Sequence, residues 1–300
     1  MKRNSVLIVA VLTAARFTSF ASAGEFELVP GNLYGVFDGG IKQFDADLTT
    51  IATLLLDLPG ARVVEGIAVN PAGNLVVSAF KGIGPTHHVL EIDGSGAIVN
   101  ELDLGFGGLD RAAHLDVDAA GRMYVASRAG VMEIRPDFSG FAALPFQFDR
   151  SSGVTVGPDD RVYVTDSQTG QLLIFGPERA FERMLQLGGL RTGLDFSAGG
   201  ELFSTRFSNG QGSVDMVDLV TGGLKTVVPL STSAIAFAPD GTYYLSVSTG
   251  ARLEHRSASH QILHERNLPG FRSDSIVVYV PEPASIVLLA GVLLCSIRQR

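Results

Sequence analysis

The sequence predicts an all-β protein, a six-bladed β-propeller, and three observations carry that prediction. One pattern recurs five times: an alternating apolar strand, a turn rich in Pro, Gly and Asp, and a second strand. Successive copies begin 48, 39, 40 and 41 residues apart, which is close to the length of a four-stranded propeller blade. Long amphipathic helical patterns are absent between the copies, which argues against a parallel α/β fold. The copies span residues 66–77, 114–125, 153–164, 193–204 and 234–245.

The rest of each unit supplies two further short strands. Residues 130–135 and 171–175 are typical third strands, and residues 97–102 and 261–266 are typical fourth strands. We expect the first strand of each unit to line a central channel, and the turn after it to lie at the far end of that channel.

The two ends of this repeat predict how the ring closes. Residues 32–45 match the second and third strands of a unit but lack a full first strand before them. Residues 274–280 form a spare first strand, which falls 41 residues after the last one if Ser275 takes its first position. We therefore expect a composite last blade that joins this C-terminal strand to the N-terminal strands. Five whole units and one composite unit make six blades, and closure removes exposed sheet edges.

The segment 162–175 resembles an NHL-type repeat, and the other units match that pattern more loosely. The resemblance supports a propeller over most of residues 30–280. It does not specify a function, because this fold serves enzymes and binding modules alike.

The first 23 residues predict a secretory signal peptide. Lys2 and Arg3 supply a positive start, residues 6–15 an apolar stretch, and Ala21 and Ala23 the small residues of a cleavage site. The alternative is an ordinary core helix, which these flanks fit less well. The sequence therefore divides into a leader (1–23), a propeller domain (24–280) and a C-terminal segment (281–300), with apolar helices expected at both ends.

The C-terminal segment has three parts in a fixed order. Pro281, Glu282 and Pro283 precede an apolar run over 284–297, and Arg298 and Arg300 follow it. The run is shorter than the about 20 residues of a stable membrane span. The order of these parts resembles the PEP-CTERM sorting signal. That resemblance implies an exosortase-type membrane protease as a partner, transient contact with the inner membrane, and a Gram-negative-type bacterium that makes extracellular polysaccharide. The alternative is an uncleaved tail anchor.

Charge and cysteine content narrow the function further. Five of the 23 basic residues and none of the 31 acidic residues lie outside 24–283, so the body has a net charge of −13. An acidic surface disfavours nucleic acid, which needs a basic one. Cys295 is the only cysteine, so neither an intramolecular disulfide nor a cysteine metal cluster can form. We expect an exported protein of the cell envelope, the surface or the extracellular matrix.

Several ionisable residues that could bind a ligand or take part in catalysis are expected at the predicted channel mouth. In five units the first residue of the first strand is small, but in the remaining unit this residue is His114. Two residues further on, Asp116 and Asp195 are polar in a largely apolar column, and Glu65 and Asp274 come just before two first strands. Carboxylates and an imidazole in one cleft could bind a divalent cation or act as acid and base. The alternative is a wet channel that binds only water.

Two function classes follow. The first is a non-enzymatic binding module that contacts a protein, a glycan or a matrix component through loops around 81–88 and 105–112, the first of which contains His87 and His88. The second is an enzyme that resembles the gluconolactonase-like six-bladed propellers, a likeness that implies a divalent metal held by axial carboxylates and asparagines. Glu65, Asp195 and Asp274 are available here, but matching axial asparagines are not evident.

Overall fold

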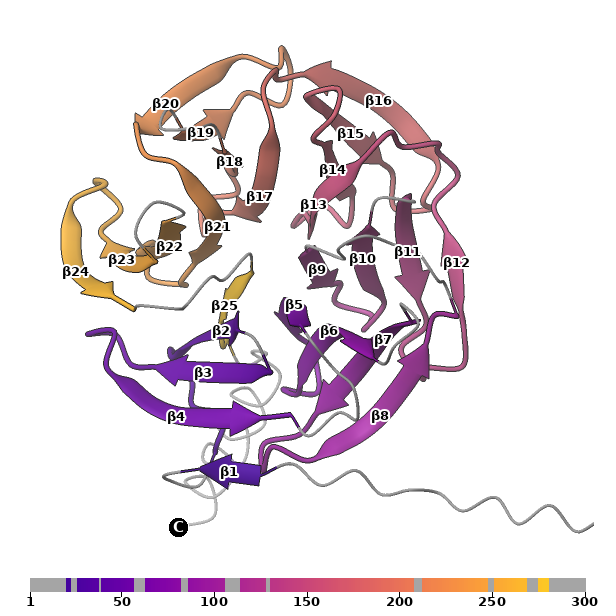
Figure 1. Ribbon diagram of the computed structural model, residues 1–300. Coiled ribbons are helices and arrows are strands. Elements are labelled where there is room, and N and C mark those ends of the chain that lie inside the picture. Colours follow the sequence, from indigo (N-terminus) through magenta and orange to yellow (C-terminus); the bar gives the residue numbers. More distant parts are fainter. Residues whose placement is uncertain are drawn as a thin grey trace, which may run out of the picture.

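A computed structural model describes residues 20–22, 26–37, 39–56, 63–81, 86–105, 114–127, 130–207, 212–247, 251–268 and 275–280. Every regular element in these ranges is a strand, and the strands form six antiparallel sheets arranged radially around one axis (Figure 1). The predicted six-bladed β-propeller is therefore confirmed.

Five blades are continuous in the sequence and contain four strands each, counted outward from the channel. The innermost strands that follow one another around the channel in Figure 1 are β5, β9, β13, β17, β21 and β25. The strands of the five continuous blades are β5 (Val63–Val69), β6 (Leu75–Lys81), β7 (Thr86–Ile92), β8 (Ile98–Asp103); β9 (His114–Val117), β10 (Met123–Ser127), β11 (Gly130–Ile134), β12 (Phe141–Ala143); β13 (Ser151–Val156), β14 (Val162–Asp166), β15 (Gln171–Phe175), β16 (Phe181–Gln186); β17 (Arg191–Phe196), β18 (Leu202–Arg206), β19 (Ser213–Val217), β20 (Leu224–Val228); and β21 (Thr232–Phe237), β22 (Tyr243–Val247), β23 (Arg252–Arg256), β24 (Ile262–Asn267).

The sixth blade closes the ring from both ends of the chain. Its inner strand is β25 (Ile276–Val278), which pairs with β2 (Leu33–Phe37), and β3 (Gly40–Phe44) and β4 (Thr50–Leu55) follow outward. The predicted composite blade is thus confirmed. A fifth strand, β1 (Phe20–Ser22), pairs with the outer edge of β4. It lies within the predicted leader, so cleavage after Ala23 would leave a four-stranded blade.

The inner strands pack closely against one another, and this explains the small residues at their first position. A Cβ atom on Gly153 would lie 2.5 Å from the carbonyl oxygen of Thr192 on the next inner strand. Four of the inner strands have a register shift at this point, which is typical of a β-bulge. In three blades a second-strand hydroxyl accepts the glycine amide hydrogen at the bulge: Gly66 to Ser78 (2.9 Å), Gly153 to Thr165 (2.9 Å) and Gly193 to Thr205 (2.7 Å).

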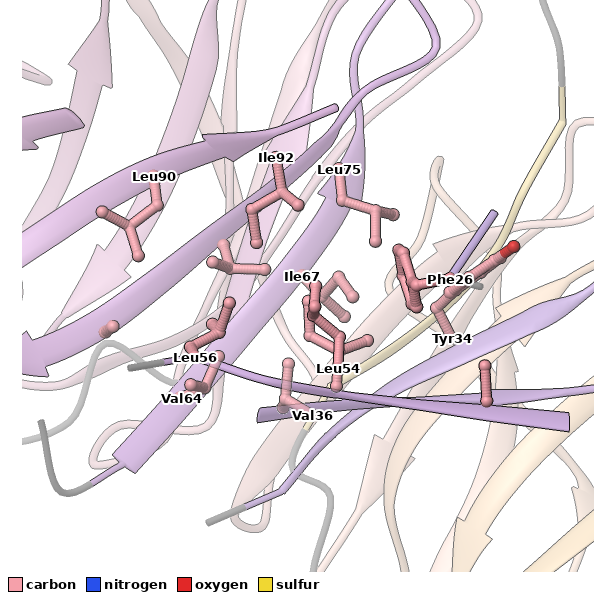
Figure 2. Packing of buried hydrophobic residues seen from close by; sticks show 14 residues of the cluster. Phe26, Tyr34, Val36, Leu54, Leu56, Val64, Ile67, Leu75, Leu90 and Ile92 are labelled. Atoms are coloured by element: carbon pink, nitrogen blue, oxygen red, sulfur yellow. The ribbon is translucent and has the colours of Figure 1, made fainter. Parts of the chain in front are cut away.

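The hydrophobic core is divided among the spaces between neighbouring blades. Figure 2 shows one of these clusters, in which Tyr34, Val36 and Leu54 of the composite blade pack against Ile67 and Leu75 of the blade β5–β8. Burying such side chains contributes about 1.5–3 kcal/mol each. Because each cluster is shared by two blades, every blade depends on its neighbours for stability.

The predicted helices at the two ends fall mainly on 1–19 and 281–300, outside the described residues, and the described part of the leader is the strand β1. Within the described residues no helix is long and apolar enough to cross a membrane. The sorting motif Pro281, Glu282 and Pro283, with Arg298 and Arg300, also lies outside them.

Candidate functional site in the central channel

The inner strands place the sequence-predicted site residues as follows. His114 begins β9, Asp116 lies two residues further along it, and Asp195 lies on β17. Glu65 is buried on β5 at the bulge. Asp274 and the loop residues 82–85 and 106–113 lie outside the described residues.

His87 and His88, predicted on a loop, are instead buried in strand β7. The insertion that precedes them is shorter than the sequence suggested, because the strand begins at Thr86. His88 lies 2.8 Å from a carboxylate oxygen of Glu101 on the adjacent strand β8. This histidine therefore belongs to the packing of its blade.

Asp116 links two adjacent blades. One oxygen of its carboxylate accepts hydrogen bonds from the Val156 amide (2.7 Å) and the Thr155 hydroxyl (3.0 Å), both on β13. The other oxygen accepts the amide of the next residue, Val117, at 2.8 Å. The inner edge of β13 has no further strand beside it, so the carboxylate satisfies a channel-facing amide that would otherwise need water.

Asp195 makes the same connection one pair of blades further on. Its carboxylate accepts the Phe237 amide of β21 at 2.7 Å and the amide of its own neighbour, Phe196, at 2.8 Å. Two blades around the ring therefore use the same device, an inner-strand aspartate that accepts an amide of the next inner strand.

The charge of Asp116 also acts on Asp195. Burial raises the pKa of Asp195 to about 7, and the nearby negative charge of Asp116 contributes to that rise. Burial likewise raises the pKa of Asp116, while its hydrogen bonds to the Val156 and Val117 amides oppose the increase. A carboxyl group whose pKa is raised toward neutrality has a property expected of a general acid or base.

His114 contacts the blade opposite its own. Its imidazole interacts with the backbone carbonyl of Ser233, at the start of β21. The same carbonyl accepts a hydrogen bond from the Thr192 hydroxyl at 3.2 Å. Burial lowers the pKa of His114 to about 4, so the ring is neutral at ordinary pH. The Ser233 carbonyl thus links the blades of β9, β17 and β21 at the channel.

The predicted cation site stays a prediction. Within the described ranges no group of three or more His, Cys, Asp or Glu side chains is arranged to hold a metal ion. The fifth predicted residue, Asp274, is outside these ranges, so the complete site stays a prediction.

Sequence reasoning did not find two features near the channel. Thr155 takes the position in its inner strand that Asp116 and Asp195 take in theirs, and its hydroxyl donates a hydrogen bond to Asp116. The polarity of Thr155 was the one sequence feature that pointed to this contact. The second feature is a hollow of about 480 Å³ on the turn side of the channel. Its lining is the last residue of each of three inner strands and the turn that follows it, namely residues 117–119, 156–158 and 196–200. Nothing in the repeat itself distinguishes these turns from the others.

A buried ion-pair network lies beside this hollow and was also missed. The fully buried carboxylate of Asp118 accepts Arg122 Nε (2.6 Å), an Arg179 guanidinium nitrogen (2.8 Å) and the Tyr124 hydroxyl (3.0 Å). Arg179 comes from a turn of the following blade and also lies 3.3 Å from Glu133. The network ties the blade β9–β12 to the blade β13–β16.

Comparison with known proteins finds similar structures but no similar sequences. No protein-family model and no curated protein matches the sequence. Among solved structures, the chain is similar to a protein of unknown function from Bacteroides caccae, with a TM-score of 0.64, 12% identity, and coverage of 83% of this chain and 98% of that one. It is also similar to a chain of a nidogen/laminin complex (TM-score 0.68, 13% identity, 84% and 99% covered).

A third similar structure is the virginiamycin B lyase of Staphylococcus aureus (TM-score 0.57, 12% identity, 84% and 89% covered). All three identities are too low to transfer an activity or a site. Together with the six radial sheets, these likenesses identify the chain as a six-bladed β-propeller that shares its fold with that lyase.

Proposed function

We propose that the chain is an exported propeller that acts as a non-enzymatic binding module, displayed at the cell surface or released into the matrix through its C-terminal sorting segment. The observation that carries this proposal is the use of the channel side chains. Asp116 and Asp195 accept amide hydrogens of neighbouring inner strands, and His114 contacts the Ser233 carbonyl. The most prominent polar groups of the channel thus serve to hold blades together, which favours recognition on the outer surfaces.

The ends of the sequence support the cellular part of the proposal. A leader with small residues at Ala21 and Ala23 precedes the body, and the Pro281-Glu282-Pro283 motif, the apolar run and the terminal arginines follow it. The partners that fit are an exosortase-type protease for sorting, and an extracellular polysaccharide or a surface protein as ligand. The likeness to a chain of the nidogen/laminin complex supports a binding role only by analogy of fold.

Fractionation of cells that produce the full chain tests the sorting step. Deletion of 281–300 should release a folded body from the envelope. A variant with Pro281, Glu282 and Pro283 all changed to Ala keeps the apolar run and should remain unprocessed in the membrane fraction. Unchanged localisation and mass in both variants would contradict the sorting role. Binding of the purified body to extracellular polysaccharide from the producing cells, measured by calorimetry, tests the ligand class.

A metal-dependent hydrolase or lactonase is the second candidate, favoured by one observation. Desolvation raises the pKa values of the half-buried Asp116 and Asp195, and carboxylate oxygens are ligands for hard divalent cations. The lyase among the similar structures shows that the fold can support catalysis. Metal content of purified residues 24–280, with melting curves in the presence and absence of EDTA, separates the two candidates. A stoichiometric divalent ion and an EDTA-sensitive melting temperature would favour the enzyme.

A further inference from the structure

The C-terminal end of the propeller leaves from one defined face. We call the end of the molecule that carries the turns between first and second strands and between third and fourth strands the turn face. In the composite blade, Val278 at the end of β25 pairs with Leu33 at the start of β2, which places both at that face. The Gly31 amide donates to the Tyr279 carbonyl, and the Tyr279 amide donates to the Asn32 carbonyl, each at 2.9 Å.

Tyr279 is held in place by side-chain packing as well. Its ring lies edge-on to the ring of Tyr34, with 6.5 Å between centroids, and a Cβ atom on Gly73 would lie 2.8 Å from its hydroxyl. Gly73 belongs to the turn between β5 and β6, so Tyr279 bridges two blades at the turn face. The next residue, Val280, is exposed and is the last described residue. The direction in which the chain leaves the propeller is therefore set by the fold.

The connection from this point to the apolar run is short. Only Pro281, Glu282 and Pro283 separate Val280 from Ala284, where the apolar run begins. Four residue steps reach at most about 14 Å. Two of the three connecting residues are prolines, whose rings fix φ, so the sequence offers few freely rotating backbone angles between Val280 and Ala284. A body attached this way cannot turn its opposite face toward the surface in which 284–297 is inserted.

We propose that the C-terminal segment holds the turn face of the propeller against a lipid bilayer, with the opposite face directed away from it. This inference rests on the proposed function, because it requires that 284–297 enters a membrane. The strand β6, which has seven residues, indicates a separation of roughly 20 Å between the two faces. A partner would therefore meet the face that carries the connections between second and third strands while the body is still attached.

Charge on the turn face indicates that the attachment depends on the tail alone. Exposed carboxylates outnumber the arginines on its turns. Arg122, Arg161 and Arg179 are paired with acidic side chains, and Arg135 is exposed. Such a surface is repelled by anionic lipids within a Debye length of about 8–10 Å. Removal of the tail should consequently free the body from the bilayer. The exposed acidic residues in these turns are Asp47, Asp137, Asp159, Asp160, Glu178, Glu201, Asp218 and Asp240.

Site-specific fluorescence quenching on proteoliposomes tests the orientation. The full chain, with Cys295→Ser, receives a single cysteine on the turn face (Ala72→Cys or Ala198→Cys) or on the opposite face (Gln168→Cys). All three positions are exposed. Each variant carries an environment-independent dye and is reconstituted into phosphatidylcholine vesicles with a nitroxide-labelled headgroup lipid, which quenches over short distances. A matched set carries 20 Gly and Ser residues inserted after Val280.

We expect several-fold stronger quenching at the two turn-face positions than at Gln168→Cys, and loss of that difference in the set with the long insert. Equal quenching at all three positions in vesicle-bound protein would overturn the orientation but leave tail anchoring intact. Failure of the full chain to co-sediment with vesicles would overturn both, because the tail would then not enter the bilayer. Co-sedimentation is scored separately, so the two failures are distinguishable.

Discussion

The Asp195 carboxylate on β17 accepts a hydrogen bond of 2.7 Å from the Phe237 amide on β21, 42 residues later in the sequence. Asp116 and Val156 form the equivalent contact between β9 and β13. Both aspartates are half-buried at an inner strand edge that has no further strand beside it. These contacts join β9 to β13 and β17 to β21.

Asp195 should make stability fall as pH rises toward neutral. Its pKa is raised to about 7 from 3.8, so the folded protein binds this proton more tightly than the unfolded chain does. Its contribution is fully present below pH 3.8 and is lost as pH rises through about 7, by up to roughly 4 kcal/mol. Asp195→Asn should flatten the curve of unfolding free energy between pH 4 and pH 8, as measured by denaturant titration. Asp240→Asn, on an exposed turn, serves as control and should keep the parent slope across pH 5–8.

His114 should have the opposite effect in acid. Its pKa is lowered to about 4 from 6.5, so only the unfolded chain takes up this proton as pH falls below 6.5. Stability is lost between pH 6.5 and pH 4, by up to roughly 3 kcal/mol. His114→Gln retains an N–H donor for the Ser233 carbonyl without titrating, and it should remove this loss. An unchanged difference between variant and parent from pH 7 to pH 4 would show that the ring is not kept neutral.

The Asp118 network should be a major source of stability. Its carboxylate is fully buried and accepts two guanidinium groups and the Tyr124 hydroxyl. Asp118→Ala leaves the Arg179 charge poorly compensated and should cost about 3–5 kcal/mol of unfolding free energy. The control is Glu182→Ala, which breaks the exposed pair with Arg161 (2.8 Å) and should cost at most about 1 kcal/mol. Similar losses in both variants would contradict the assignment.

Crowding between inner strands can be tested at Gly153. An added methyl group would lie 2.5 Å from the Thr192 carbonyl oxygen, a backbone atom that cannot move without shifting β17. Gly153→Ala should therefore cost about 1–3 kcal/mol, read as a lower midpoint of chemical unfolding. Gly94→Ala has no atom within 4 Å of the new methyl group and should stay within about 0.5 kcal/mol of the parent. Equal tolerance of both changes would argue against close packing at the axis.

Closure by β25 predicts a sharp difference between two truncations. A chain that ends at 280 keeps the pairing of Val278 with Leu33 and should unfold cooperatively. A chain that ends at 274 lacks β25, which leaves the inner edge of β2 unpaired and exposes apolar side chains such as Leu33 and Ile67. It should aggregate or lose its cooperative transition in size-exclusion and thermal unfolding experiments. A shorter chain as stable as the longer one would exclude closure by this strand.

Much of the fold could be predicted because propeller repeats are local. The alternation of apolar residues, the turn chemistry after each first strand and the interval of about 40 residues all lie within one unit. The spare strand before Val280 and the missing strand before Leu33 predicted the composite blade for the same reason. His87 and His88 were misplaced because a Gly-containing insertion does not reveal where the following strand begins.

The partners of the candidate site residues could not be predicted in this way. Sequence alone identified His114, Asp116 and Asp195 as unusual in their columns and assigned them to a channel mouth. Their hydrogen-bond partners are about 40 residues away or on another blade, and the bulges and strand register decide which amide or carbonyl each side chain reaches. The link from Asp118 to Arg179 likewise depends on two turns that meet only in the assembled ring.

The sequence by itself determined the number of blades and the way the ring closes, because both follow from local periodicity and composition. Only the tertiary structure decided that the channel carboxylates hold neighbouring strands, that their burial shifts their pKa values, and that the chain leaves beside Tyr279 on the turn face. Those properties depend on distances between blades, and distances arise only when the sheets pack around a common axis.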